Sequence, residues 1–184
     1  ALPRLAGAQD FPNRAIRMII PYPPGGASDV IARILGPHMT EALGQPIVIE
    51  NRPGGNGGIA AEFVARSPAD GYTLLMGNAG PNALNAAVYG ARLTYDVIRD
   101  FTPISLVSKV PMLIASHPSV PITNLQEMIA LGRARNGDLS FAHGGTGAAP
   151  HLTMEQLADM NGFKWTPVPF RGGALALTSV QPVA

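Results

Sequence analysis

Short apolar runs bounded by turn residues recur along the chain, and such runs are typical of buried strands. In the first half these runs are Ile16–Ile20, Ile47–Ile49 and Tyr72–Met76. Two segments between them have helical apolar spacing, namely Ile31–Leu43, with Ile31, Leu35, Met39 and Leu43 four residues apart, and Ile59–Arg66. An alternation of strand and helix predicts an α/β fold with a mostly parallel sheet.

Residues in and around the first helical segments predict where these helices begin, bend and end. Ser28 suits an N-cap, and Asp29 favours the positive end of a helix. Gly36-Pro37 predicts a kink or a short break, and Gly44 suits the helix end. Pro81 is expected in the first turn of a later helix.

The second half begins with two β-rich runs, Ile104–Val107 and Met112–Ser116, which predict two more strands. The residues between them, Lys109 to Pro111, predict a crossing between domains, and a hinge is expected near Val107–Pro111. Further on, the predicted elements are helices at Asn124–Arg135 and Leu152–Met160 and strands at Leu139–Ala142 and Thr166–Phe170.

Composition excludes several classes of protein. The 184 residues are 46% hydrophobic and 14% charged, which is typical of a globular chain with a real core. The net charge is +1 and the basic residues are scattered, so no nucleic-acid surface is expected. Cysteine is absent, which excludes disulfides and thiolate sites, and no apolar run is long enough to cross a bilayer.

The strand-to-helix turns are rich in glycine, at Gly25-Gly26, Gly77–Gly80, Gly144–Gly147 and Gly172-Gly173. The first N–H groups of a helix lack partners and lie at the positive end of its dipole. Glycine lets a ligand approach them closely, so a carboxylate or phosphate can be held without Arg or Lys. One such turn alone is more often a simple connection, but several after strands favour an anion site, because ligands bind there in open α/β sheets.

Known cofactor and catalytic motifs are absent. No G-x-x-x-x-G-K-[ST], H-E-x-x-H or G-x-S-x-G occurs, so no cofactor, no metal and no catalytic residue is predicted. His143 and His151 flank one loop, where a turn or capping role is the ordinary interpretation. An α/β enzyme acting on small organic acids, with Asp29 or His151 as acid–base group, is the alternative from a different class.

The N-terminal stretch ALPRLAGAQDFPNR has no initiating Met, and Ala6-Gly7-Ala8 has the small-x-small form of a signal-peptidase site. We therefore expect residues 1–12 to be a signal-peptide remnant, with a flexible terminus as the other interpretation. The mature domain would begin near Gln9.

Several longer stretches of the chain resemble one family of transport proteins. They are IRMIIPYPPGGASDVIARIL, LGQPIVIENRPGGNGGIAAEFVARSPADGYTLLMG, DFTPISLVSKVPMLIASHPSVP, FAHGGTGAAPHL and VPFRGGALAL. In this order they resemble the periplasmic solute-binding proteins of the tripartite tricarboxylate transporter family, the Bug receptors. The resemblance implies a type II periplasmic-binding-protein fold, the two-lobed Venus flytrap, with lobes over 13–108 and 109–184.

The resemblance also implies a function without catalysis. The protein would capture a small carboxylate solute in the periplasm, after signal-peptide removal, and present it to membrane permease subunits. In the family, backbone groups and ordered water largely hold the carboxylate. By matching position, the ligand-binding residues are Tyr22, Pro24, Gly25, Gly26, Ala27, Ser28 and Asp29; Asn78, Ala79 and Gly80; and His143, Gly144, Gly145, Thr146, Gly147, Ala148 and His151.

Two departures from the family pattern lead to further expectations. The family's second-lobe loop commonly carries serines where this chain has His143, Gly144 and Ala148, so His143 is expected to supply a donor, and if protonated it favours an anion. Family members also continue well past Leu177. We therefore expect an incomplete second lobe with exposed apolar surface, and a dimer or swapped oligomer formed through it. A truncated product that does not bind is the third alternative.

Overall fold

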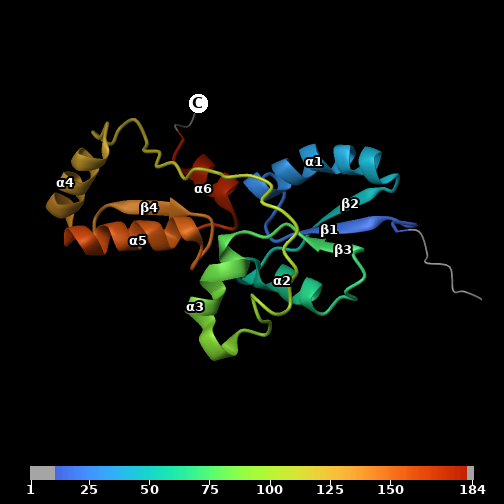
Figure 1. Ribbon diagram of the computed structural model, residues 1–184. Helices are drawn as coiled ribbons and strands as arrows, with labels where there is room; N and C mark the ends of the chain where they lie inside the picture. The colour runs from blue at the N-terminus through green and yellow to red at the C-terminus, as the bar shows by residue number, and fades with distance from the viewer. Residues whose placement is uncertain (1–10, 182–184) are drawn as a thin grey trace, which may run out of the picture.

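A three-stranded parallel sheet lies at the centre of the first lobe in this computed structural model, which describes residues 11–181 (Figure 1). Its strands are β1 (Ile16–Ile20), β2 (Ile47–Asn51) and β3 (Thr73–Leu75), in the order β2-β1-β3. β1 pairs with both neighbours, and its Ile19 and Ile20 are 0% exposed. The three strands predicted in this half are confirmed.

Two helices connect these strands. Helix α1 (Ala27–Leu43) joins β1 to β2, and α2 (Gly58–Ala65) joins β2 to β3. The apolar face of α1 packs on the sheet, where Met18, Ile20, Ala32 and Met76 form the buried cluster of this lobe. Parallel strands need such crossovers, so the first lobe is α/β as predicted.

The ends of α1 confirm some local predictions and correct others. The N-cap is Gly26, with Ser28 inside the first turn, because the chain is already helical at Ala27. The helix also continues through Pro37 without the predicted break. Gly36 allows close packing there, since a Cβ on it would lie 3.3 Å from Ile49 Cδ1. Gly44 ends the helix in the left-handed conformation, at φ 68°, as predicted.

After β3 the chain forms a short π-helical turn, Gly80–Leu84, which continues into α3 (Asn85–Tyr89). Pro81 lies at the start of this turn, as predicted. Asn85 is 0% exposed, and its side chain accepts from Asn56 Nδ2 at 3.1 Å and donates to Tyr95 Oη at 3.2 Å. The buried side chain of Asn85 therefore holds the side chain of Asn56 in a fixed position in the first lobe.

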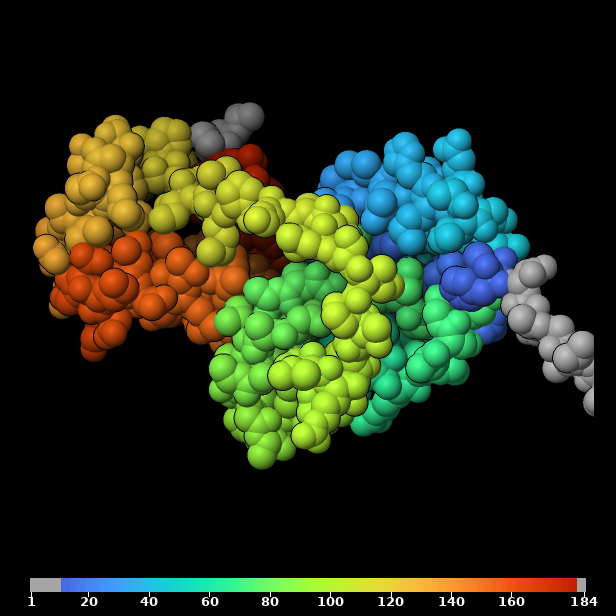
Figure 2. Space-filling view, in the orientation of Figure 1, coloured from blue at the N-terminus to red at the C-terminus, as the bar shows by residue number. Residues whose placement is uncertain are grey.

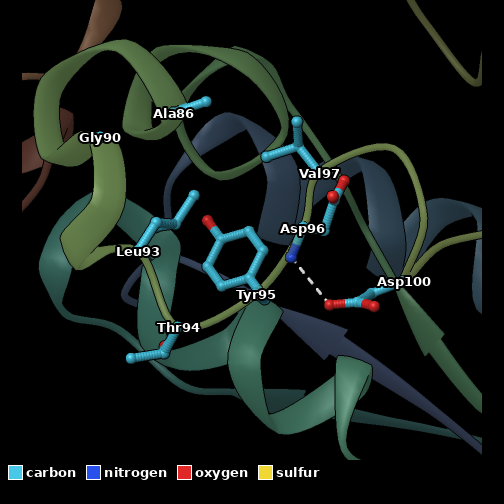
Figure 3. A pocket seen from close by; sticks show the side chains of 8 residues that line it. All are labelled: Ala86, Gly90, Leu93, Thr94, Tyr95, Asp96, Val97 and Asp100. Atoms are coloured by element: carbon cyan, nitrogen blue, oxygen red, sulfur yellow. Dashed lines mark hydrogen bonds between the residues drawn. The ribbon is translucent and has the colours of Figure 1, made fainter.

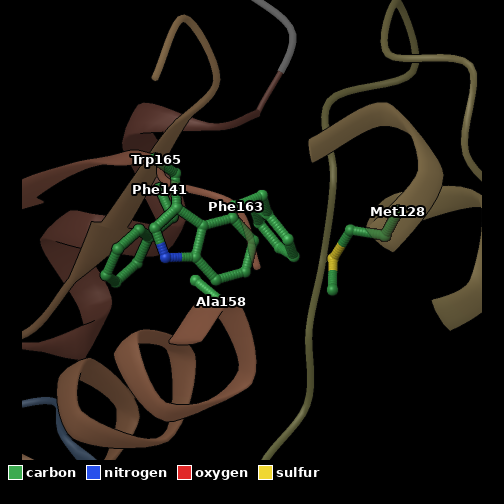
Figure 4. Close-up of a cluster of buried hydrophobic side chains, with 5 residues drawn as sticks. All are labelled: Met128, Phe141, Ala158, Phe163 and Trp165. Carbon is green, nitrogen blue, oxygen red and sulfur yellow. The ribbon is translucent and has the colours of Figure 1, made fainter. Parts of the chain in front are cut away.

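The second lobe contains the parallel pair β4 (Ser140–His143) and β5 (Thr166–Pro169) with helices α4 (Leu125–Arg135), α5 (Ala149–Asn161) and α6 (Gly173–Ser179). Its core comprises Met128, Phe141, Ala158, Phe163 and Trp165 (Figure 4). α4 begins where Asn124 Oδ1 accepts from the Glu127 N–H at 2.9 Å. It packs closely on Phe163, because a Cβ on Gly132 would lie 2.5 Å from Phe163 Cε2. The predicted helices and strands of residues 124–170 are confirmed.

The segment 101–116 differs from the prediction, because neither β-rich run forms a strand. It passes over the surface between the two lobes (Figure 2). Ile104, Leu106 and Leu113 are 79%, 72% and 89% exposed. A strand needs a partner for its backbone groups, and no strand of residues 11–181 pairs with this segment. The predicted lobe boundary at 108 falls within it.

Candidate functional site

The loops that follow β1 and β3 lie at a topological switch point. In the strand order β2-β1-β3, the connection after β1 leads to β2 on one side of β1. The connection after β2 then leads to β3 on the other side of β1. Ligands of open α/β sheets bind in the crevice at such a point. The Tyr22 hydroxyl bridges the two sides, because it lies 3.2 Å from Asn56 Oδ1 and 3.2 Å from Asn78 Oδ1. Burial raises the pKa of Tyr22, so the hydroxyl keeps its proton.

The N-terminus of α1 presents unpaired donors beside this switch point. Across the described part of the chain, no hydrogen bond uses the N–H groups of Gly26, Ala27 or Ser28. These groups begin a 17-residue helix, so they also lie at the positive end of its dipole. Together they form a donor set suited to a carboxylate.

Asp29 supports this loop and is not a free base. Its side chain is 4% exposed, and its carboxylate accepts from Gly25 N–H, Arg33 Nε and Asn51 Nδ2, each at 3.0 Å. The Arg33 hydrogen bond is the main cause that lowers the pKa of Asp29 to about 2, against the opposing effect of burial. A carboxylate held in this way is a poor proton acceptor, which contradicts the acid–base role considered for Asp29.

The loop 77–80 uses its own donors internally. The Asn78 N–H donates to Asn82 Oδ1 at 3.1 Å, and the Gly80 N–H donates to Asn78 Oδ1 at 3.0 Å. Gly80 is buried against the Tyr22 hydroxyl, where a Cβ would clash. Ala79 is exposed. This loop therefore contributes shape and the Tyr22–Asn78 contact, and within the described residues only its other two N–H groups, those of Gly77 and Ala79, have no hydrogen-bond partner.

The second-lobe loop follows β4 and enters α5. The Gly145 N–H donates to His143 Nδ1 and the Gly147 N–H to His151 Nδ1, each at 3.3 Å. Gly144 packs against the start of α6, since a Cβ there would lie 2.7 Å from Gly173 N. Any residue with a Cβ at this position would need a different approach of α6.

The two lobes touch through these same loops. Asn56 Nδ2 donates to the Gly147 carbonyl at 3.0 Å, and a Cβ on Gly172 would lie 3.5 Å from Pro23 Cγ. The structure thus brings together the first-lobe and second-lobe loops predicted from the sequence. Of the predicted residues, those buried are Asp29, Gly80, His143, Gly147 and Ala148, and those exposed are Pro24, Gly25, Ala27, Ala79 and Thr146.

Sequence reasoning missed two amides of the site, Asn51 and Asn56. Asn51 Nδ2 donates to the Tyr22 carbonyl at 3.0 Å as well as to Asp29. Asn56 has a φ of 50°, in the left-handed region. The sequence features that could have indicated them are the position of Asn51 at a strand end and that of Asn56 inside a glycine run. Asparagine tolerates the left-handed backbone region that such a run often adopts.

A surface pocket of about 570 Å³ lies elsewhere on the first lobe (Figure 3). Its lining comprises Ala86, Gly90, Leu93, Thr94, Tyr95, Asp96, Val97 and Asp100. None of these is a predicted site residue, and the two carboxylates disfavour an anionic ligand. Within residues 11–181 no group of three His, Asp or Glu side chains is placed to hold a metal ion, and no helix has the length and apolarity to span a membrane.

Two α/β lobes that meet through strand-end loops define the class of two-lobed periplasmic binding proteins. The chain belongs to the tripartite tricarboxylate transporter receptor family. Residues 31–182 match the TctC family, described as the tripartite tricarboxylate transporter family receptor. This confirms the predicted resemblance and places the chain in a family of receptors rather than enzymes.

Curated relatives extend beyond the length of this chain. Protein BugT of Bordetella pertussis is 36% identical over 174 residues, which are 94% of this chain and 53% of BugT. A UPF0065 protein from the tcbD-tcbE intergenic region of Pseudomonas sp. strain P51 is 34% identical over 170 residues, 92% of this chain and 50% of that protein. The chain therefore spans about half the length of these relatives.

Solved structures confirm the fold. R. palustris Rpa4515, solved with adipate, is 37% identical with a TM-score of 0.87, over 93% of this chain and 57% of that one. MatC from Rhodopseudomonas palustris, with bound malate, is 33% identical with a TM-score of 0.83, over 92% and 57%. The periplasmic binding protein BugD is 31% identical with a TM-score of 0.80, over 92% and 56%.

Proposed function

We propose that this chain belongs to a periplasmic receptor that binds a small carboxylate solute and delivers it to the membrane permease of a tripartite tricarboxylate-type transporter. The observation that carries the proposal is the set of unpaired N–H groups at Gly26, Ala27 and Ser28, at the switch point of the sheet. Related proteins with adipate and with malate support an acid as the solute.

In this proposal, backbone N–H groups of the first lobe bind the carboxylate, and the second-lobe loop covers the binding site. Each hydrogen bond from an N–H to a carboxylate contributes about 1.5–3 kcal/mol. The Asp29 network holds the loop 22–26 in place before the ligand arrives, which reduces the ordering cost of binding. The Asn56–Gly147 hydrogen bond fixes the position of the second-lobe loop relative to these first-lobe loops.

The export of the receptor is part of the same proposal. The predicted signal-peptide remnant at residues 1–12 lies almost wholly outside the described residues, which begin at Phe11. The family membership supports a periplasmic location and a permease partner. Detection of the tagged protein in the periplasmic fraction tests the location.

Replacing Ala27 by proline removes one proposed donor while keeping the helix. Proline is tolerated at the first helical position, and Gly26 already has the extended conformation (φ −77°, ψ 166°) that a residue before proline requires. We expect Ala27→Pro to weaken carboxylate binding roughly tenfold to a hundredfold, the value of one charge-assisted hydrogen bond. Calorimetric titration with malate and adipate measures the change.

Ala27→Ser is the matched control, because it keeps the N–H on an exposed residue and should bind like the parent chain. The diamides of both acids should not bind. Equal binding by the two variants would place the carboxylate elsewhere. A chain that unfolds cooperatively but binds neither acid would contradict the function and support the non-binding alternative.

The sequence predicts an oligomer through an incomplete second lobe, and we propose segment 101–116 as a further surface for it. The exposed apolar side chains and unpaired backbone of this segment can be covered by the same segment of a second copy. We expect sedimentation to show a dimer at micromolar concentration and Leu113→Lys to shift it to monomer, because Leu113 is 89% exposed and the change costs the fold little. A monomeric parent chain would contradict this part of the proposal.

A further inference from the structure

Two histidines of the second lobe lie ring against ring beside the proposed site. His143 is the last residue of β4, and His151 lies in the first turn of α5. Their ring centroids are 4.4 Å apart. His143 is only 2% exposed, and the His151 side chain is 15% exposed. The loop between them contacts the first lobe through the Gly147 carbonyl, so the pair lies close to the junction of the lobes.

The hydrogen bonds of the loop fix the protonation pattern of both rings. His143 Nδ1 accepts from the Gly145 N–H, and His151 Nδ1 accepts from the Gly147 N–H. A ring nitrogen that accepts carries no hydrogen, so each neutral imidazole has its hydrogen on Nε2. Neither Nε2 has a hydrogen-bond partner within residues 11–181; His151 Nε2 lies 4.0 Å from Glu155 Oε1, beyond hydrogen-bond distance. Among the described residues the buried side-chain atoms without a partner comprise Trp165 Nε1 alone, so the unpaired Nε2 of His143 retains access to solvent at the edge of a buried ring.

The charges around the pair are few. Burial is the main cause that lowers the pKa of His143 and the neighbouring His151 lowers it further, whereas the Gly145 hydrogen bond and Glu155 of α5 oppose them. β5 (Thr166–Pro169) and the contacting Asn56 carry no ionisable group. Arg171, which precedes the Gly172-Gly173 turn that packs on Gly144, is exposed to solvent. Two rings 4.4 Å apart do not both become cations readily, so the pair has room for one proton.

We infer that His143 and His151 form a single proton-binding unit that takes up one proton when a carboxylate binds at the second-lobe loop. An anion near the Nε2–H groups favours the imidazolium form. The proton comes from bulk water and forms the N–H bond at Nδ1 of one ring, and the hydrogen bond that this Nδ1 accepts from the loop breaks. The inference rests on the proposed function and assigns His143 a role in ligand choice that a serine cannot perform.

The direction of the pH dependence follows from this linkage. The anion raises the pKa of the pair in the complex above its value in the free protein. Affinity therefore rises as pH falls through the bound-state pKa and levels off below the free-state pKa. With one coupled proton, the affinity changes at most about tenfold per pH unit.

Calorimetry in two buffers of different ionisation enthalpy counts the protons taken up with malate or adipate. We expect uptake of up to one proton by the parent chain between pH 5 and 8, and none by the double variant His143→Gln/His151→Gln, which keeps side-chain donors but does not titrate. His38→Gln is the matched control, because His38 is exposed on α1 and the variant should behave like the parent. Binding without buffer-dependent heat, or the same uptake in all three proteins, would overturn the inference.

A second variant and a second measurement separate this inference from the proposed function. His151→Gln replaces only the less buried ring, in case the double variant does not fold, and it should leave proton uptake by the remaining His143 but shift this uptake to higher pH. Without ligand, nuclear magnetic resonance follows both imidazoles with pH. We expect His151→Gln to raise the pKa of His143, because a competing cation is removed. Independent titration of the two rings would overturn the inference, whereas coupled titration with no binding of any acid would refute the function alone.

Discussion

Trp165→Ala is expected to lower the free energy of unfolding of the second lobe by about 4 kcal/mol, the usual cost of removing a large aromatic side chain from a core. Trp165 is 7% exposed, and its ring lies 5.0 Å from that of Phe163 and 5.1 Å from that of Phe141. The cavity would reach the site, because the Phe141 ring lies 5.5 Å from His143 and 6.2 Å from His151. Binding of malate should therefore weaken together with stability.

Trp165→Phe is the matched variant for this experiment. The indole Nε1 is buried without a hydrogen-bond partner among the described residues, so its removal relieves an unsatisfied donor while most of the ring remains. We expect a loss below about 1.5 kcal/mol. Urea unfolding must be followed by circular dichroism, because Trp165 is the single tryptophan of the chain. Equal losses for both variants would show that the indole shape, and not buried area, determines the stability.

Asp29→Ala is expected to cost about 3 kcal/mol, since it leaves the Gly25 N–H, Arg33 and Asn51 without their common acceptor. The loop that leads into α1 would lose its anchor, so carboxylate binding should fall as well. Asp29→Asn keeps the shape but lacks the charge, and about half of the loss is expected. A variant with unchanged stability and binding would contradict the positioning role of Asp29.

The same residue predicts a pH dependence of stability. Its folded-state pKa of about 2 lies below the ordinary value of 3.8, so between these values the unfolded chain binds more protons than the folded one. The contribution of Asp29 is therefore complete above about pH 4 to 5 and is lost as pH falls toward 2. The difference in unfolding free energy between the parent and Asp29→Asn should shrink over this window. A constant difference would contradict the lowered pKa.

Local sequence patterns predicted the strands and helices because their physical causes are local. The run Ile16–Ile20 is apolar apart from Arg17, and it forms the central strand, which has neighbours on both sides. Of the residues spaced by four, Ile31, Leu35 and Met39 form the face of α1 that packs on the sheet, whereas Leu43 is exposed. Segment 101–116 has an equally strong β pattern and forms no strand, because strand formation depends on a partner that the pattern does not encode.

The sequence by itself determined the α/β class, the glycine turns after the strands and the family of the chain. The tertiary structure decided which donors remain free at those turns. Gly25, Gly80, Gly145 and Gly147 give their N–H groups to side chains of Asp29, Asn78, His143 and His151, whereas Gly26 and Ala27 keep theirs. Asn56 reaches a carbonyl 91 residues away. Whether a donor meets an acceptor depends on the backbone conformation of the loop and, for Asn56, on the packing of distant segments, and a sequence pattern specifies neither.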